Sequence, residues 1–192
     1  MYQKYIKRLF DIILSSILIL FFFLLMILIF FLVWTFIGFP IFFQKRPGLN
    51  HKIFTLYKFK SLYDAAKNIP EHKRQNKLGN FLRKTGLDEL PQLFNVLKNN
   101  MSFVGPRPLL TEYLKKYNTN EKKRHLVKPG ITGLAQINPD PSGIKSWNKS
   151  IKLDIFYVNN LSFFLDIEIL FKTVVLILFK KKQYKDFKKT YE

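Results

Sequence analysis

No cysteine occurs among the 192 residues of this chain, and acidic residues are scarce. The absence of cysteine excludes disulfides, thiolate metal sites and cysteine nucleophiles. Only 13 Asp and Glu residues stand against 32 Lys and Arg residues, which gives a formal net charge of +19. This charge predicts an anionic partner, either nucleic acid or the anionic surface of a membrane. Because carboxylates are few, two that are adjacent are candidates for a chemical role.

Charge is also absent from residues 12–38, a segment dominated by Leu, Ile and Phe. As a helix the segment is roughly 40 Å long. A hydrocarbon core is about 30 Å thick, so the segment is long enough to span it. Cations nevertheless flank both sides, among them Lys7, Arg8, Lys45 and Arg46. Because such residues prefer the cytoplasmic side, the flanks favour a re-entrant helical hairpin with both ends in the cytoplasm. An ordinary single span, with the rest of the chain in the cytoplasm, is the alternative.

The predicted fold class is α+β, mostly α. We expect residues 1–40 to form a membrane-inserted helical element and residues 41–192 to form a small domain on the cytoplasmic membrane surface. Apolar residues at 41–43 and 53–56 flank Pro47-Gly48, which predicts a short β-hairpin with a turn at these two residues.

Apolar spacing in the second half of the chain predicts several helices. Leu78, Phe81 and Leu82 indicate a short helix, a second begins near Asp88, and a charged surface helix covers residues 111–127. Another covers residues 147–158. Residues 163–179 are strongly apolar but contain Asp166, Glu168 and Lys172, so we expect an amphipathic helix that lies in the membrane interface.

Asp88 and Glu89 are adjacent carboxylates at a predicted helix start, with Pro91 in the first turn. Backbone N–H groups and the helix dipole favour anions there and keep a carboxylate ionised. An aspartate can attack phosphorus to form an acyl phosphate. Mg²⁺ typically takes one or two protein carboxylates plus phosphate oxygens, so the pair can divide these two roles. The alternative is an ordinary cap, since Thr85-x-x-Asp88 matches a capping box.

Arg107 lies between two prolines in the run Val104-Gly105-Pro106-Arg107-Pro108. A residue before proline avoids the helical region, so the arginine is expected on an extended backbone. A guanidinium matches a phosphate group with two parallel hydrogen bonds. The alternative is a rigid loop whose arginine is merely solvated.

Further candidates for a phosphate-rich pocket are basic side chains along the chain. These are Arg46, Lys58, Lys60, Arg83 and Arg124. Asp154 could hold a metal, support another ligand or pair with a lysine. The three histidines are scattered without metal-ligand spacing and are expected at the surface. Pro129-Gly130-Ile131-Thr132-Gly133 is expected to be a turn, which could also let a nucleotide approach the backbone.

Taken together, these runs resemble the small monotopic phosphoglycosyl transferases of the bacterial sugar-transferase family. The likeness extends over nearly the whole chain and keeps the order of the blocks. The blocks are Lys7-Arg8-x-Phe10-Asp11, Gln44-x-Arg46-Pro47-Gly48, Lys58-Phe59-Lys60-Ser61, Leu87-Asp88-Glu89-Leu90-Pro91-Gln92, Met101-Ser102-Phe103-Val104-Gly105-Pro106-Arg107-Pro108, Pro129-Gly130-Ile131-Thr132-Gly133-x-Ala135-Gln136 and Leu153-Asp154-x-x-Tyr157.

The resemblance implies an enzyme that transfers a phosphosugar from a UDP-sugar to a polyprenol phosphate such as undecaprenyl phosphate, with release of UMP. It implies that Asp88 is the nucleophile of a covalent phosphosugar intermediate and that Glu89 binds Mg²⁺. Arg107, Lys58, Lys60, Arg46, Arg83 and Asp154 are the expected substrate and phosphate contacts. It also implies a re-entrant membrane helix and a location on the cytoplasmic face of the bacterial inner membrane.

Two departures from the family pattern stand out. Family members usually break the re-entrant helix at a Ser-Pro pair, but the matching stretch here is Phe22-Phe23-Leu24. The family also commonly continues Ala-Gln-x-Asn with Gly-Arg. Here Asn138 is followed by Pro139-Asp140-Pro141-Ser142-Gly143, so we expect either a different donor preference or a replacement of the missing charge by Lys145.

Two other function classes compete with the enzyme. A non-enzymatic membrane protein would bind anionic lipid or a protein partner, and it predicts no dependence on Mg²⁺. Nucleic-acid binding is disfavoured because the aromatic residues gather in apolar runs and do not alternate with basic residues.

Overall fold

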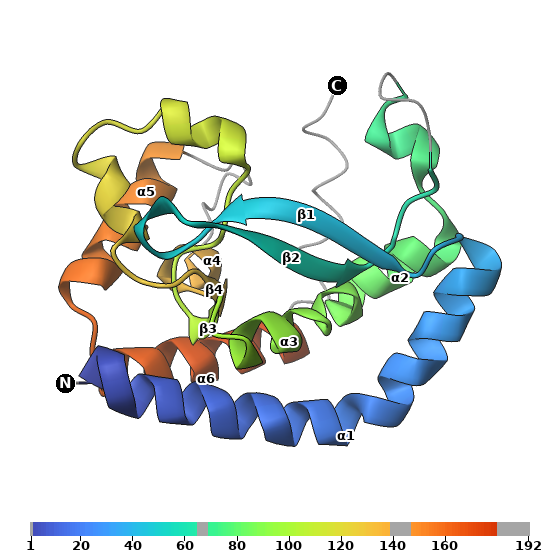
Figure 1. Ribbon diagram of the computed structural model, residues 1–192, viewed down its shortest axis with the longest axis horizontal. Helices are drawn as coiled ribbons and strands as arrows, with labels where there is room; N and C mark the ends of the chain where they lie inside the picture. The colour runs from blue at the N-terminus through green and yellow to red at the C-terminus, as the bar shows by residue number, and fades with distance from the viewer. Residues whose placement is uncertain (1, 65–68, 139–146, 180–192) are drawn as a thin grey trace. The chain divides into compact units, whose positions relative to one another are not determined.

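The computed structural model describes residues 2–64, 69–138 and 147–179 and is mostly helical, with two small two-stranded sheets (Figure 1). The predicted α+β, mostly α class is therefore confirmed. The chain divides into two compact units. One unit carries the pair Asp88 and Glu89, here called the dyad; this dyad unit contains the described residues 10–45, 55–64 and 69–99. The other carries Arg107; this arginine unit contains residues 2–9, 46–54, 100–138 and 147–179. Each unit is described by itself.

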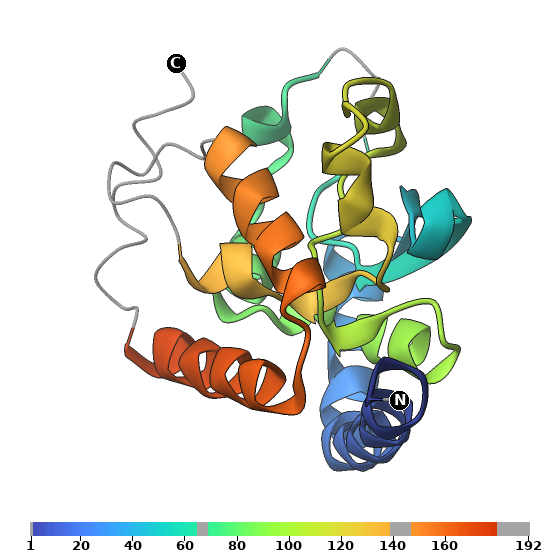
Figure 2. The same ribbon diagram turned by 90° about the vertical axis from the view of Figure 1, so that its left-hand side faces the viewer.

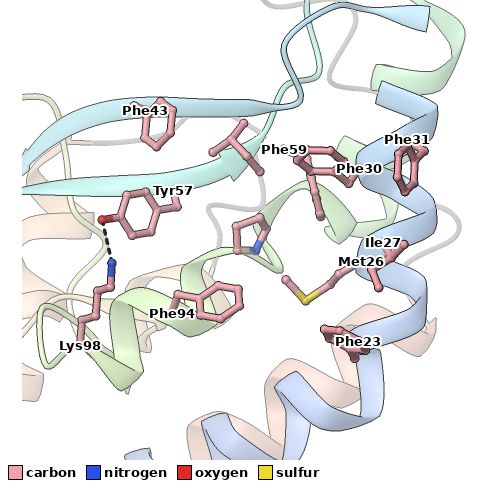
Figure 3. A pocket seen from close by; sticks show the side chains of 12 residues that line it. Phe23, Met26, Ile27, Phe30, Phe31, Phe43, Tyr57, Phe59, Phe94 and Lys98 are labelled. Carbon is pink, nitrogen blue, oxygen red and sulfur yellow. Dashed lines mark hydrogen bonds between the residues drawn. The ribbon is translucent and has the colours of Figure 1, made fainter. Parts of the chain in front are cut away.

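The apolar N-terminal segment forms one helix, α1 (Lys7–Phe36), after a π-helical turn at Tyr2–Ile6. Within the described ranges it is the one helix that is long and apolar enough to cross a membrane. A helical hairpin of two separate segments is not seen. Instead, α1 stays continuous and changes direction along its length, near Phe23 (Figures 1 and 3). The bend lies at the stretch that lacks the Ser-Pro pair, so it forms without proline.

The second half of α1 packs into the core of the dyad unit. Ile29, Val33 and Ile37 recur every four residues and are buried together with Phe59 and Leu82. Apolar residues on the other faces remain exposed, including Leu20, Phe21 and Leu24. Asp11 and Ser15 in the first half are buried as well, so α1 has buried positions on both sides of the bend.

A β-hairpin follows α1, as the sequence predicts. Its strands β1 (Ile41–Pro47) and β2 (Ile53–Phe59) are longer than predicted. A short 3-10 helix, Leu49–His51, forms the turn. Asn50 has φ 50° and His51 has φ 63° there, so two residues adopt the left-handed conformation that a tight reversal requires.

Short helices complete the dyad unit: a 3-10 helix (Glu71–Arg74), α2 (Lys77–Thr85), a 3-10 turn (Leu87–Glu89) and α3 (Gln92–Leu97). Asn76 caps α2, since its side-chain oxygen accepts from the backbone N of Gly79 at 2.7 Å. A Cβ at Gly79 would lie 1.9 Å from the carbonyl oxygen of Ser61. This glycine therefore lets α2 approach the chain that follows β2.

The sheet of the arginine unit corrects one prediction. β3 (Ser102–Val104) pairs in parallel with β4 (Gly130–Thr132), with Ser102 opposite Gly130. Residues 129–133 therefore contain a strand and are not merely a turn. A Cβ at Gly130 would lie 2.1 Å from the backbone N of Gly105. The glycine is thus explained by close backbone packing, without any nucleotide.

The predicted charged helix over residues 111–127 is wrong. Two 3-10 helices take its place, at Thr111–Lys115 and Glu121–His125. Arg124 is 2% exposed and His125 is 4% exposed. A surface helix cannot form over this segment because its basic end turns into the core to make specific hydrogen bonds. His125 likewise corrects the expectation that all three histidines lie at the surface.

Three helices close the arginine unit: α4 (Leu134–Ile137), α5 (Trp147–Asn159) and α6 (Phe163–Phe179). The predicted α5 and α6 are confirmed, and the chain turns sharply between them (Figure 2). Asp166 of α6 is buried and accepts from Lys7 Nζ at 2.5 Å and from the Tyr157 hydroxyl at 2.7 Å. This network fixes the start of the N-terminal helix to both α5 and α6. The interfacial position of α6 stays a prediction.

Candidate active site

The two adjacent carboxylates lie on a tight turn between α2 and α3. Gly86 ends α2 with φ 75°, a left-handed conformation that favours glycine. Asp88 and Glu89 occupy the 3-10 turn that follows, and α3 begins only at Gln92. The predicted position at the start of an α-helix is therefore corrected to the turn before it.

The capping-box alternative for Asp88 is also corrected. Thr85 is the last residue of α2, and its hydroxyl donates to the carbonyl oxygen of Phe81 at 2.9 Å. It lies at the C-terminal end of one helix, so it cannot be the N-cap of the next. A helix-capping role therefore no longer accounts for the pair of carboxylates.

The two carboxylates differ in their surroundings. Asp88 is buried, with 8% of its surface exposed. Glu89 is half-buried, and its Oε1 accepts from Lys58 Nζ of β2 at 2.6 Å. Such a charge-assisted contact is among the stronger hydrogen bonds in proteins. The pair thus combines a shielded carboxylate with one that already binds a cation.

The side chain of Asn95 binds α3 to the backbone of β2. Its side-chain amide donates to the carbonyl oxygen of Thr55 at 2.7 Å and accepts from the backbone N of Tyr57 at 3.0 Å. The side chain is completely buried, where an unmade hydrogen bond would be expensive. Asn95 is not among the functional residues predicted from the sequence.

The other two cations predicted for the dyad unit have different environments. Lys60 is buried and forms an ion pair with Asp64. Arg83 is exposed on α2. Lys58 contacts the dyad directly, through Glu89. The phosphate-binding roles of all three stay predictions.

Arg46, Arg107 and Asp154 belong to the arginine unit, where they share one structure. Three successive backbone carbonyls at residues 106–108 are each hydrogen bonded. That of Pro106 accepts from Gly130 N at 3.0 Å, that of Arg107 from Arg124 Nη2 at 2.8 Å, and that of Pro108 from Arg46 Nη1 at 3.1 Å. The side chain of Arg107 is exposed. We call residues 106–108 the arginine loop.

Arg124 is itself fixed by buried partners. Its Nε and Nη2 donate to Asp154 Oδ2 at 3.0 and 2.7 Å, and its Nη1 donates to the Tyr117 hydroxyl at 2.9 Å. Burial raises the pKa of Asp154, and the Arg124 guanidinium opposes that shift. Burial also raises the pKa of the Tyr117 hydroxyl. Asp154 thus supports the arginine loop through Arg124, a link that the sequence alone does not show.

Magnesium can be matched to these residues by donor type. Within the described ranges, no three side chains of His, Asp or Glu gather as a ready-made metal cage. Mg²⁺ does not need one, since it is usually bound by one or two carboxylates together with substrate phosphate oxygens. Asp88 and Glu89 fit that requirement. The predicted Lys145 and the altered loop 139–143 lie outside the described residues.

Comparison with known proteins decides the family. The profile described as bacterial sugar transferase matches residues 2–180. The chain belongs to the bacterial sugar transferase family. The expected enzyme class, a phosphoglycosyl transferase, is confirmed at that level by the family and by the relatives below.

Individual relatives are between a third and a half identical to the chain over the aligned residues. It is 47% identical over 178 residues to the uncharacterized sugar transferase EpsL of Bacillus subtilis, covering 90% of this chain and 87% of that protein. It is 39% identical to the UDP-glucose:undecaprenyl-phosphate glucose-1-phosphate transferase of Klebsiella pneumoniae, covering 93% of this chain. It is 36% identical to the undecaprenyl-phosphate galactose phosphotransferase of Salmonella typhimurium, covering 91% of this chain. The chain spans only 41% of the length of each of these last two enzymes.

Proposed function

We propose that this protein transfers a sugar phosphate from a UDP-sugar to undecaprenyl phosphate or a similar polyprenol phosphate, releasing UMP. Support comes from the family and from relatives named for sugar-phosphate transfer to undecaprenyl phosphate. The observation that carries the proposal is the dyad turn, where a buried Asp88 adjoins a Glu89 that is paired with Lys58.

The proposed reaction has two displacements at one phosphorus atom. A carboxylate oxygen of Asp88 attacks the sugar-bearing phosphorus of the donor, and the bond to the bridging oxygen of UMP breaks. The product is an aspartyl phosphosugar. A phosphate oxygen of the polyprenol phosphate then attacks the same phosphorus, and the acyl phosphate bond breaks. This step restores the Asp88 carboxylate and forms the polyprenyl diphosphate sugar.

Glu89 is proposed to hold Mg²⁺ together with phosphate oxygens of the donor. When bound, the ion would neutralise the charge that develops on the transferred phosphoryl group. Lys58 balances the charge of Glu89 in the structure described here. Arg107 lies on the arginine loop, whose three backbone carbonyls are hydrogen bonded. Its side chain is proposed to bind a phosphate group of the substrate.

Membrane attachment follows from α1 and its exposed apolar faces. We propose that α1 is re-entrant, entering and leaving the membrane on the cytoplasmic side, with its bend inside the bilayer. The cations on both flanks of the apolar segment support this topology. A membrane location matches the lipid-linked acceptor, which cannot leave the bilayer.

The test is to trap the covalent intermediate. Purified protein in detergent or nanodiscs is incubated with Mg²⁺ and a radiolabelled UDP-sugar in the absence of acceptor. We expect a stoichiometric release of UMP and a labelled adduct that mass spectrometry of peptides locates at Asp88. Asp88→Asn should abolish both. Asp64→Asn is the matched control, because Asp64 is an exposed acidic residue of the same unit. UMP release by Asp88→Asn at the wild-type rate would reject Asp88 as the nucleophile.

A further inference from the structure

An apolar cleft opens in the dyad unit (Figure 3). It has a volume of about 790 Å³. Met26, Ile27 and Phe30 line it from α1, Phe43 and Tyr57 from the hairpin, and Phe94 from α3. Met26 extends into the space between α1 and α3, toward the side from which Phe94 projects. A cleft of this size falls within the usual range for bound organic ligands.

Several apolar side chains that line this cleft remain exposed in the protein alone. Ile27 is 39% exposed, Phe43 is 54% exposed and Phe94 is 38% exposed. Large apolar side chains that converge on an open cleft indicate a binding site for an apolar molecule. One wall is the membrane helix itself, at its bend, so the cleft is accessible to a molecule that resides in the bilayer.

Polar groups are confined to one part of the lining. Lys98 donates to the Tyr57 hydroxyl at 3.3 Å, and its ammonium lies 4.9 Å from the centre of the Tyr57 ring. The other described lining residues are hydrocarbon, aromatic, thioether or proline side chains. A ligand with a long hydrocarbon chain and one anionic end matches this distribution, because the chain fills the apolar part while the charge stays near Lys98.

The cleft adjoins the chain segment that follows the dyad. Pro91 lines the cleft and lies two residues after Glu89. A chain lying in the cleft would therefore end beside the dyad turn.

We propose that the cleft holds the isoprenoid segment next to the phosphate of the lipid acceptor, so that the phosphate faces Asp88. This inference rests on the proposed function and adds the acceptor's binding site to it. The cleft takes only the phosphate-proximal part of the chain, and the remaining isoprene units lie in the bilayer. It thereby aligns the acceptor for the second displacement and favours acceptors with a branched, unsaturated chain.

The test compares two tryptophan substitutions on α1. Ile27→Trp places a larger side chain in the cleft, whereas Leu28→Trp adds the same bulk at a neighbouring exposed position outside the lining. The amount of UMP released in the absence of acceptor measures the amount of correctly folded enzyme. Turnover with acceptor is therefore divided by this amount for each variant. We expect Ile27→Trp to raise the KM for undecaprenyl phosphate about tenfold, which corresponds to roughly 1.4 kcal/mol. Leu28→Trp should change it less than about twofold. Equal KM values for the two variants would overturn the proposal.

A photoreactive acceptor provides the second measurement. A polyprenyl phosphate with a diazirine on its first isoprene units is irradiated with the wild-type protein in nanodiscs, and the crosslinked peptides are sequenced. Crosslinks to α3 and to the bend of α1, competed by undecaprenyl phosphate, support the proposal. Competition by phospholipid alone would mean that the cleft holds acyl chains and would overturn it. Failure of the proposed function is distinguishable, because it would abolish the UMP burst in the wild-type protein.

Discussion

Arg124 and Asp154 form a buried ion pair in which two guanidinium nitrogens contact one carboxylate oxygen, at 3.0 and 2.7 Å. The same guanidinium holds the backbone carbonyl of Arg107 at 2.8 Å. A carboxylate on α5 thereby positions the loop that carries the proposed phosphate-binding arginine. We propose that Asp154 acts as a positioning residue through Arg124, and its direct contact with substrate stays a prediction.

Asp154→Asn should lower kcat/KM for the UDP-sugar by roughly 10- to 100-fold, which corresponds to about 1.4–2.7 kcal/mol. The substitution leaves Arg124 with a neutral partner, so the arginine loop loses a fixed support. Steady-state kinetics over a range of UDP-sugar concentrations measures the change. Breaking a buried pair also destabilises the fold, so thermal unfolding is recorded for each variant. Glu168→Gln is the control, because Glu168 is an exposed acidic residue of α6.

A double-mutant cycle separates positioning from general destabilisation. If Asp154 acts through the arginine loop, its substitution should have little further effect on kcat/KM once Arg107 is replaced by alanine. A full additional loss in the Arg107→Ala background would show that Asp154 does not act through Arg107.

Lys58→Gln should reduce turnover and, at the same time, lower the Mg²⁺ concentration needed for half-maximal activity. Lys58 neutralises Glu89 at 2.6 Å, so it competes with a metal for that carboxylate. Removing it leaves Glu89 more available to Mg²⁺, while the loss of a cation weakens phosphate binding. Titration of UMP release with Mg²⁺ measures both effects. Lys60→Gln, which removes a cation of the same unit that pairs with Asp64, serves as the comparison. An unchanged or higher Mg²⁺ requirement in Lys58→Gln would contradict this account.

Local patterns predicted much of this chain, because the information for those elements lies within a few residues. The strongly apolar run ending in Phe179 predicted α6 with the bounds that the structure shows. The hairpin around Pro47-Gly48 was predicted by turn chemistry. The adjacent carboxylates were recognised as a site because acids are rare in this sequence.

Elements that depend on distant partners were not predictable in the same way. β4 has three residues, and its pairing with β3 joins residues 102 and 130, so no local periodicity marks it. The run Glu121–His125 has the composition of an exposed helix, yet Arg124 is buried because Asp154 and Tyr117 bind it. Asn95 fixes β2 through backbone groups, and backbone hydrogen bonds leave no signature in a single sequence.

The stability of the protein should fall as the pH is lowered from about 6.5 to about 4. Burial lowers the pKa of His125 to about 4, assisted by Arg124 and by His51, whose ring lies 4.7 Å away. A hydrogen bond with the backbone of Gly48 opposes the shift. Between these pH values the unfolded chain binds a proton that the folded chain does not, so stability rises with pH.

The contribution of His125 amounts to roughly 2–3 kcal/mol at the acidic end of this range. It is measured as the difference between the pH profiles of thermal unfolding for the wild-type protein and for His125→Asn. The variant should show a shallower fall in melting temperature below pH 6.5. His72→Asn is the control, since His72 is exposed, and its profile should match the wild type. Parallel profiles for His125→Asn and the wild type would contradict the buried, neutral state of His125.

The absence of cysteine makes the topology of α1 directly measurable. Single cysteines are introduced at Lys4 and Lys45, which are exposed on the two sides of the apolar segment, and at Leu24 near its middle. If α1 is re-entrant, a membrane-impermeant maleimide should label positions 4 and 45 in inside-out vesicles and neither in right-side-out vesicles. Position 24 should stay unlabelled in both until detergent is added. Labelling of positions 4 and 45 from opposite sides would establish a spanning helix, because the bend near Phe23 would then be only a kink within a crossing segment.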